Sequence, residues 1–181
     1  MKAEKMTVFT IGHSTHSLDE FVEMLRANGV EKLIDIRSLP GSTKFTHFDR
    51  ESLSKSLRNR KIGYKLLKKL GGRRRVNKDN TSNLGWRNAA FRGYADYMQT
   101  EGFAEGLAQL IEIASEKRVA IMCAEAVPWR CHRSLVADAL ITRGINVRDI
   151  FSKTSTKPHE LNAMARVSKG QLSYPEEKQA S

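Results

Sequence analysis

The chain has 181 residues, of which 40% are hydrophobic and 28% are charged, values typical of one domain that buries its core without disulfides or structural metals. No apolar run is long enough to span a membrane, and residues 1–6 lack the apolar stretch of a signal peptide, so we expect a soluble, cytoplasmic protein with both cysteines reduced. The net charge of +11 favours an anionic partner.

Strand and helix signals alternate from the start of the chain, a pattern typical of α/β folds. Residues 7–11 form a β-prone run that ends at Gly12-His13-Ser14. Ser17 and Glu20 form a capping box that opens a helix, and Gly29 is its expected stop. Three further elements follow: a strand over residues 32–37, a helix from Asp49 to about Arg60 and a strand over residues 63–67.

The middle of the chain, residues 71–93, shows no periodicity, which predicts a long loop of the kind that is usually functional or disordered in a compact domain. The remaining elements are predicted as helices over residues 94–99, from Thr100 onward and over 132–143, and as strands over 118–123 and 146–151. Residues 1–151 are therefore predicted to form a single three-layer α/β domain, with a mainly parallel sheet of about five strands and helices on both faces. The polar residues 152–181 are expected to form an appended, partly disordered tail.

Basic residues are concentrated in one segment, residues 50–78. It holds twelve lysines or arginines against one acidic residue and so carries the whole net charge of +11. Two interpretations fit such a segment. It is either a solvated helix face followed by a flexible loop, or a surface that neutralises the phosphates of a polyanion and releases their counterions. We favour the second and expect Arg73, Arg74 and Arg75 to bind the anion.

The most informative stretch is the loop of residues 122–134, Met-Cys-Ala-Glu-Ala-Val-Pro-Trp-Arg-Cys-His-Arg-Ser. It places both cysteines, a carboxylate, a histidine and two arginines between a predicted strand and a predicted helix. In an open α/β sheet, ligands bind outside the carboxyl ends of the strands, and the next helix offers free N–H groups to an anion. This loop is therefore the candidate active or binding site.

Motifs along the chain also carry a family resemblance. They are, in order, Ile11-Gly12-His13-Ser14, Asp35-Ile36-Arg37 with Pro40, His47-Phe48, Gly63-Tyr64, Leu70-Gly71-Gly72, Phe91-Arg92-Gly93-Tyr94-Ala95-Asp96-Tyr97-Met98, and Met122-Cys123-Ala124-Glu125-Ala126 with Cys131-His132-Arg133. From about residue 7 to 151 the chain resembles the domain-of-unknown-function 488 (DUF488) family. The resemblance implies an α/β domain whose motifs gather at one site, and it implies no particular reaction.

The two cysteines are candidate nucleophiles. Cys123 directly follows a buried-looking strand, where a free cysteine is often only a small core residue. Cys131 lies near a helix start beside Arg130, His132 and Arg133, a cationic setting that lowers the pKa of a thiol. Cys131 is thus better placed electrostatically and Cys123 is better placed at the sheet edge, so both remain candidates.

Three further residues are candidate acids or bases. Glu125 lies two residues beyond the predicted strand, either as the ion-pair partner of a loop arginine or as a general acid or base. His132 either acts as a base or caps the helix and packs. His13, in the loop after the first strand, is the second candidate base, with Ser14 beside it as an anion donor.

Other side chains are candidates for ligand binding. Asp35 and Arg37 alternate on the second strand, either as a structural pair or as a phosphate-binding fork with an orienting carboxylate. Tyr94 and Trp129 offer rings on which a base could stack. Arg130 and Arg133 complete the anion-binding set.

No cofactor or metal pattern is present. The sequence contains neither a P-loop nor a Gly-x-Gly-x-x-Gly motif, and no Cys is followed by five residues and an Arg as in the cysteine-phosphatase loop. Zinc would require Cys123 and Cys131 to combine with remote histidines. We therefore expect no cofactor and no metal.

Together these features predict an enzyme that acts on nucleic acid or a nucleotide-like phosphorylated ligand, through Cys, Glu, His and Arg side chains at the strand ends. The alternative is a non-catalytic nucleic-acid-binding module whose thiols are structural. A module that only binds nucleic acid needs positive charge, but it does not need His, Glu and Cys side chains to converge at the strand ends.

Overall fold

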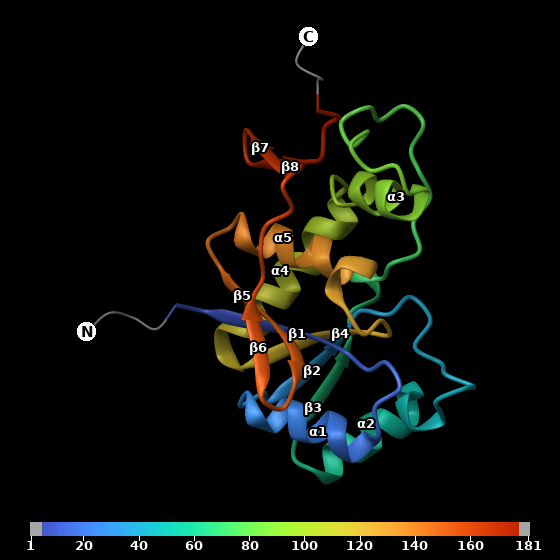
Figure 1. The fold of residues 1–181 in the computed structure, drawn as a ribbon, viewed down its shortest axis with the longest axis vertical. Helices are drawn as coiled ribbons and strands as arrows, with labels where there is room; N and C mark the ends of the chain where they lie inside the picture. The colour runs from blue at the N-terminus through green and yellow to red at the C-terminus, as the bar shows by residue number, and fades with distance from the viewer. Residues whose placement is uncertain (1–4, 178–181) are drawn as a thin grey trace.

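A six-stranded sheet organises the fold of the computed structural model, which describes residues 5–177 (Figure 1). Its strands are β1 (Thr7–Gly12), β2 (Lys32–Asp35), β3 (Gly63–Leu66), β4 (Val119–Cys123), β5 (Asn146–Ser152) and β6 (Ser155–Pro158). Their order across the sheet is β3-β2-β4-β1-β5-β6, in which only β6 runs antiparallel to its neighbour. The predicted α/β fold with a mainly parallel sheet is confirmed, and β6 is the strand that the sequence did not indicate.

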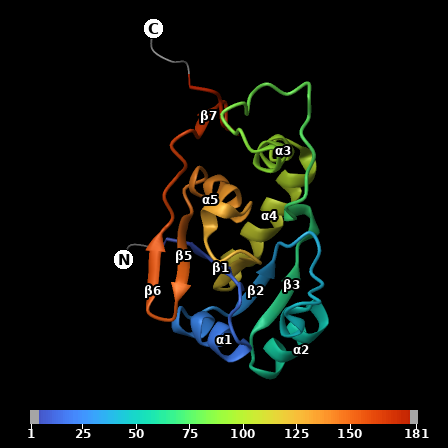
Figure 2. The same cartoon turned by 45° about the vertical axis from the view of Figure 1, so that its right-hand side comes forward.

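Helices cover both faces of the sheet and so give three layers (Figure 1, Figure 2). One face carries α1 (Leu18–Ala27) and α2 (Arg50–Asn59), and the other carries α3 (Ala89–Tyr97), α4 (Glu101–Glu116) and α5 (Arg133–Ile141). Short 3-10 turns lie in the connections: η1 (Thr46–Phe48), η2 (Lys68–Leu70) and η3 (Pro128–Arg130). No helix within residues 5–177 combines the length and apolar character needed to cross a membrane.

Strand β4 shows how the core is divided, because successive side chains of a strand point to opposite faces of the sheet. Val119 and Ile121 pack with α3, α4 and α5, whereas Ala120 and Met122 pack with α1 and α2. Every residue of β4 is buried, as expected for a strand that is covered on both faces. By the same alternation, Cys123 faces the side of the sheet on which α5 lies.

The helix starts follow the capping signals in the sequence. The Ser17 hydroxyl accepts a hydrogen bond from the Glu20 backbone N–H at 3.1 Å, and Thr100 caps α4 in the same way. Asp49 precedes α2 as predicted, but its carboxylate accepts from the Ser42 N–H at 3.2 Å instead of from the helix. That contact ties the loop after β2 to the start of α2.

The segment after β5 is an integral part of the fold. It supplies β6 and the hairpin of β7 (Arg166–Ser168) and β8 (Gln171–Ser173), and it buries Tyr174. The Tyr174 hydroxyl donates to the Asp138 carboxylate at 2.8 Å, and its backbone N–H donates to the Asn83 side chain at 2.9 Å. Because the segment is mostly polar, the sequence alone predicts a tail here and does not indicate the two contacts of Tyr174. The last four residues of that expected tail lie outside the described range.

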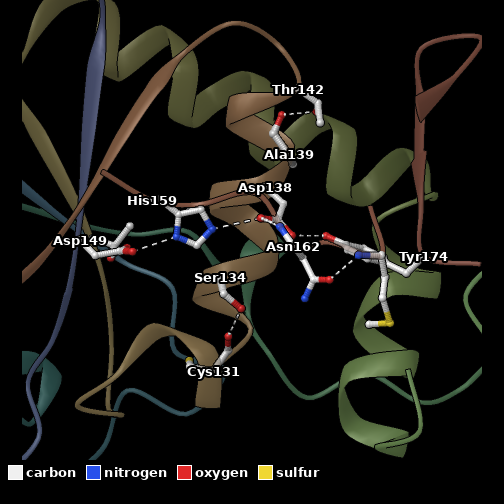
Figure 3. Close-up of polar contacts among 11 residues, drawn as sticks. Cys131, Ser134, Asp138, Ala139, Thr142, Asp149, His159, Asn162 and Tyr174 are labelled. Carbon is white, nitrogen blue, oxygen red and sulfur yellow. Dashed lines mark hydrogen bonds and ion pairs between the residues drawn. The ribbon is translucent and has the colours of Figure 1, made fainter. Parts of the chain in front are cut away.

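A charged cluster joins this segment to α5 and β5 (Figure 3). The two ring nitrogens of His159 lie 3.0 Å from Asp138 and 2.9 Å from Asp149, and all three side chains are buried. Burial alone would lower the pKa of His159, but the hydrogen bonds to both carboxylates outweigh burial and raise it from 6.5 to about 9. The imidazole is therefore charged at neutral pH and compensates two buried carboxylates.

We expect His159→Gln to lower the free energy of unfolding by about 3 kcal/mol near pH 6 and by much less near pH 10. Because the pKa is raised in the folded state, this stabilisation is fully present below the unfolded value of 6.5 and is lost as the pH rises through about 9. Urea unfolding at both pH values measures the difference. His16→Gln, which removes a partly exposed pair with Glu20, is the control. A loss of the same size at both pH values would contradict the charged state of His159.

Candidate functional site

The loops that follow β1, β2 and β4 meet at one edge of the sheet. Gly12 is in register with Cys123, and Asp35 is in register with Met122. Beyond the strands the pairing continues, because the His13 and Ser14 backbone N–H groups donate to the carbonyls of residues 123 and 124, each at 3.0 Å. The convergence expected from parallel strand ends is therefore present for these three loops.

Gly12 makes this close approach possible. A Cβ atom at this position would lie 1.6 Å from the Glu125 carbonyl oxygen, a distance that no side chain tolerates. The glycine of the Gly-His-Ser motif thus lets the loop after β4 pass directly over the end of β1.

A pocket of about 290 Å³ opens at this edge. We call it the cysteine pocket, and its walls include Arg37, Arg73, Phe91, Cys123, Glu125, Arg130, Cys131 and His132. The long loop after η2 reaches the pocket through Gly72 and Arg73. The pocket therefore gathers residues from the ends of β2 and β4, from the basic segment, from the start of α3 and from the loop before α5.

The two thiols lie at the buried side of the cysteine pocket. Both are free, with exposed fractions of 1% for Cys123 and 8% for Cys131. Burial favours the neutral thiol at Cys123, but the adjacent Cys131 thiol and the positive charge of Arg133 outweigh burial and lower the pKa of Cys123. Proximity to Cys123, together with burial, raises the pKa of Cys131. These directions favour Cys123 as the thiolate, whereas the sequence favours Cys131.

His132 orients Cys131. Its Nε2 donates to the Ile36 carbonyl at 2.8 Å, so its Nδ1, which lies 3.2 Å from the Cys131 sulfur, is left as an acceptor. Burial lowers the pKa of His132 to about 4, so the ring is neutral at physiological pH. A Cβ atom on Gly72 would lie 2.5 Å from the same Nδ1, which shows how closely the backbone of the long loop packs on this ring.

Arg133 lies behind the thiols and does not line the pocket. Its side chain is fully buried, and none of its three guanidinium nitrogens has a hydrogen-bond partner within residues 5–177. Its positive charge acts on both cysteines and on His132. A buried cation without a partner is costly, and an ionised Cys123 or an anion from the ligand would compensate it.

His13 and Ser14 line a second pocket beside the first. This pocket, of about 310 Å³, shares Arg37 and two other residues with the cysteine pocket. The His13 ring stacks on Phe48 with centroids 4.4 Å apart, and burial lowers its pKa to about 4. His13 and Glu125 therefore lie in adjoining pockets instead of the single pocket expected from the sequence.

Asp35 and Arg37 form a buried structural pair. Arg37 donates from Nε and Nη2 to the two Asp35 oxygens at 2.9 and 2.7 Å, and from Nη1 to the Phe48 carbonyl at 2.8 Å. The Tyr64 hydroxyl also donates to Asp35, at 2.5 Å. Asp35 is fully buried and lines neither pocket, whereas Arg37 lines both with most of its donors already engaged. A ligand-binding role for Asp35 is not consistent with this arrangement.

The remaining predicted residues divide between site and scaffold. Tyr94 is a core residue whose hydroxyl donates to the Leu70 carbonyl at 2.8 Å. Arg74 packs over the Tyr97 ring, 3.6 Å from its centroid, while Arg75 is exposed outside the pocket. Trp129 lines a different pocket on the far side of η3.

Glu125 keeps a free carboxylate at the mouth of the cysteine pocket. The residue is exposed, and no ion pair or side-chain hydrogen bond of Glu125 is found in the described part of the chain. The ion pair with a loop arginine that the sequence left open is therefore not formed, and the carboxylate is available to a ligand.

Sequence reasoning missed the cluster of His159, Asp138 and Asp149. Asp138 was the available signal, because it is a carboxylate in the middle of the apolar run 135–141 of helix α5. Within residues 5–177 there is no group of three His, Cys, Asp or Glu side chains arranged to hold a metal ion.

Comparison with known proteins places this site in a family. A protein-family model described as "Domain of unknown function DUF488" matches residues 17–140, more than half of the chain. Neither the curated proteins nor the solved structures gave a match. The matched range contains all the residues that line the cysteine pocket, whereas β1, His13 and Ser14 precede it.

We expect Arg133→Met to slow alkylation of Cys123 near pH 7 about tenfold, the effect of raising a thiol pKa by about one unit. The folded protein should remain as stable as the wild type, because the guanidinium has no hydrogen bond to lose and the cost of a buried charge disappears. Iodoacetamide labelling followed by peptide mass spectrometry measures both cysteines separately. Arg143→Met, which changes an exposed arginine just beyond the other end of α5, is the control. Equal labelling rates in wild type and Arg133→Met would show that Arg133 does not activate Cys123.

Proposed function

The chain belongs to the DUF488 family, whose description names no reaction, and we propose from its site that it is a thiol-dependent enzyme acting on nucleic acid or a nucleotide-like phosphorylated ligand. One observation carries this proposal: the Cys123 thiol borders a pocket and has a buried, unpartnered arginine behind it. The thiolate, not the thiol, is the nucleophile in cysteine chemistry. Purely structural thiols have no need for such a charge.

The charge around the pocket supports a phosphorylated ligand. Arg73 and Arg130 are exposed on its walls, and Arg73 belongs to the basic segment that holds the whole net charge. Arginine forks bind phosphate oxygens well because they offer several N–H donors in one plane. The pocket volume of about 290 Å³ is at the lower end of the range for small-molecule sites, which suits one phosphorylated unit.

Each group in the cysteine pocket then has a role. Cys123 is the nucleophile, and Glu125 is the general acid or base because its carboxylate is free at the pocket mouth. His132 is a positioning residue, since it holds Cys131 through Nδ1 while its own proton is committed to Ile36. Cys131, whose thiol donates to His132 Nδ1, lies beside Cys123 and contributes to the lowered pKa of that thiol.

We expect Cys123→Ser to abolish turnover while leaving ligand affinity within about twofold, because the hydroxyl fills the same space but is far less ionised. The assay incubates the protein with nucleotides and short single-stranded DNA and RNA, and follows both products and Cys123 adducts by mass spectrometry. Cys131→Ser is the matched variant and should retain part of the activity. Undiminished turnover by Cys123→Ser would refute nucleophilic catalysis by this thiol.

We expect Arg73→Ala to weaken binding of a single-stranded oligonucleotide about fivefold and to reduce the slope of log affinity against log salt by about one. Lys117→Ala is the control, because Lys117 is an exposed cation at the opposite end of β4. Arg74 is a poor choice for this test, since its side chain packs on Tyr97. Equal affinities and slopes for wild type and Arg73→Ala would show that Arg73 does not contribute to oligonucleotide binding.

The deep burial of both thiols favours a second candidate, a nucleic-acid-binding module with structural cysteines. This alternative expects oligonucleotide binding without turnover, and lower stability for Cys123→Ser and Cys131→Ser. The turnover experiment with Cys123→Ser therefore distinguishes the candidates.

A further inference from the structure

A larger pocket lies on the other side of η3 and has no role in the proposed chemistry. Its volume is about 690 Å³. We call it the tryptophan pocket, and the lining residues used below are Trp86, Trp129, Phe151, Lys157, His159 and Glu160. Two of its walls come from β5 and from β6, the strand that the segment after β5 supplies.

One turn of chain separates this pocket from the cysteine pocket. Within η3, Trp129 lines the tryptophan pocket and Arg130 lines the cysteine pocket. Just beyond η3, Cys131 lines the cysteine pocket while Ser134 lines the tryptophan pocket, and the Ser134 hydroxyl donates to the Cys131 carbonyl at 2.9 Å (Figure 3). A ligand that crosses the ridge at Trp129 and Arg130 therefore enters both pockets.

An aromatic pair forms a second link between them. Trp86 of the tryptophan pocket stacks on Phe91 of the cysteine pocket, with ring centroids 4.8 Å apart. The Trp86 indole N–H is buried and has no acceptor within the described residues, so it is left for an acceptor atom of a ligand. The two pockets are thus neighbours through side chains as well as through the backbone of η3.

The tryptophan pocket has the chemistry of a stacking site. Trp129 is 64% exposed, an unusual state for a large apolar ring, and its centroid lies 6.3 Å from that of Phe151. Lys157 lies at the edge of the same wall, with its Nζ 5.8 Å from the Phe151 centroid. Exposed aromatic rings beside a cation are the usual means of holding the bases of a single strand.

The charges of the two pockets differ, so that one pocket favours the base of a nucleotide and the other favours its phosphate. Asp138 and Asp149 share one imidazolium at His159, and Glu160 stands against the single cation Lys157, so the lining keeps a net negative charge that disfavours a phosphate. The cysteine pocket instead presents exposed arginines. A neutral, flat base suits the first pocket, and a phosphorylated unit suits the second.

We propose that the tryptophan pocket binds a nucleobase of the unit next to the one held in the cysteine pocket, so that the ligand is a single-stranded nucleic acid of at least two nucleotides and not a mononucleotide. This inference rests on the proposed function, because it assigns the neighbour of the unit that the cysteine pocket takes. The ridge residue Trp129 supplies the stacking surface, and Trp86 supplies a hydrogen-bond donor.

Binding measurements with ligands of different length test the inference. The probes are thymidine and uridine monophosphates and the fluorescein-labelled single strands of four thymidines or four uridines. Wild-type protein should bind one of the tetramers at least tenfold more tightly than its monomer. Trp129→Ala should weaken tetramer binding about tenfold and leave monomer binding unchanged, whereas Trp129→Phe should keep most of the tetramer affinity.

Val167→Ala is the control for loss of an exposed apolar side chain, because Val167 lies on the β7–β8 hairpin away from both pockets. The thymidine and uridine arms decide between DNA and RNA. If the monomer binds as tightly as the tetramer, or if Trp129→Ala weakens both alike, this inference is overturned while the proposed function stands. If no probe binds at all, both are overturned.

Discussion

Backbone hydrogen bonds between the carboxyl ends of β1, β2 and β4 fix the part of the molecule on which the site depends. They extend the parallel register by two residues past β1, to Ser14, and hold the loop after β4 against it. This contact exists because Gly12 has no side chain where the Glu125 carbonyl passes. The loop that carries both cysteines is therefore held by rigid strand ends, a sound basis for a preorganised site.

Buried charges in this fold differ in whether they have hydrogen-bond partners. The Asp35–Arg37 pair and the His159 cluster are saturated with hydrogen bonds, and each ties separate elements together. Arg133 is equally buried but has no partner within residues 5–177. A charge that adds no hydrogen bond to the native state is hard to explain as a stabilising feature, whereas its influence on the adjacent thiol gives it a chemical reason.

Much of the fold could be read from the sequence, because strand periodicity, capping residues and glycine stops are local signals. The parallel strands, the helix that begins after Ser17 and the loop with both cysteines all follow from such signals. The burial of Tyr174 could not be read, since its partners Asp138 and Asn83 lie far away in the chain. The sixth strand pairs with the adjacent β5, but its four residues are polar and end in a proline, so they give no strand signal. The ranking of the two thiols also depends on spatial neighbours. Neighbours in sequence favour Cys131, but the pKa values of both thiols depend on the contact between them and on where the Arg133 side chain lies.

The central position of β1 in the sheet limits where the chain can be cut without breaking the sheet. The family match begins at residue 17, yet β1 lies in the middle of the sheet, between β4 and β5. A fragment cut at the matched boundaries would lack both β1 and β5 and leave the apolar strand β4 with an unpaired edge, the kind of edge that invites aggregation. The stretch that the family model matches is therefore shorter than the sheet, and the residues before and after it complete the sheet.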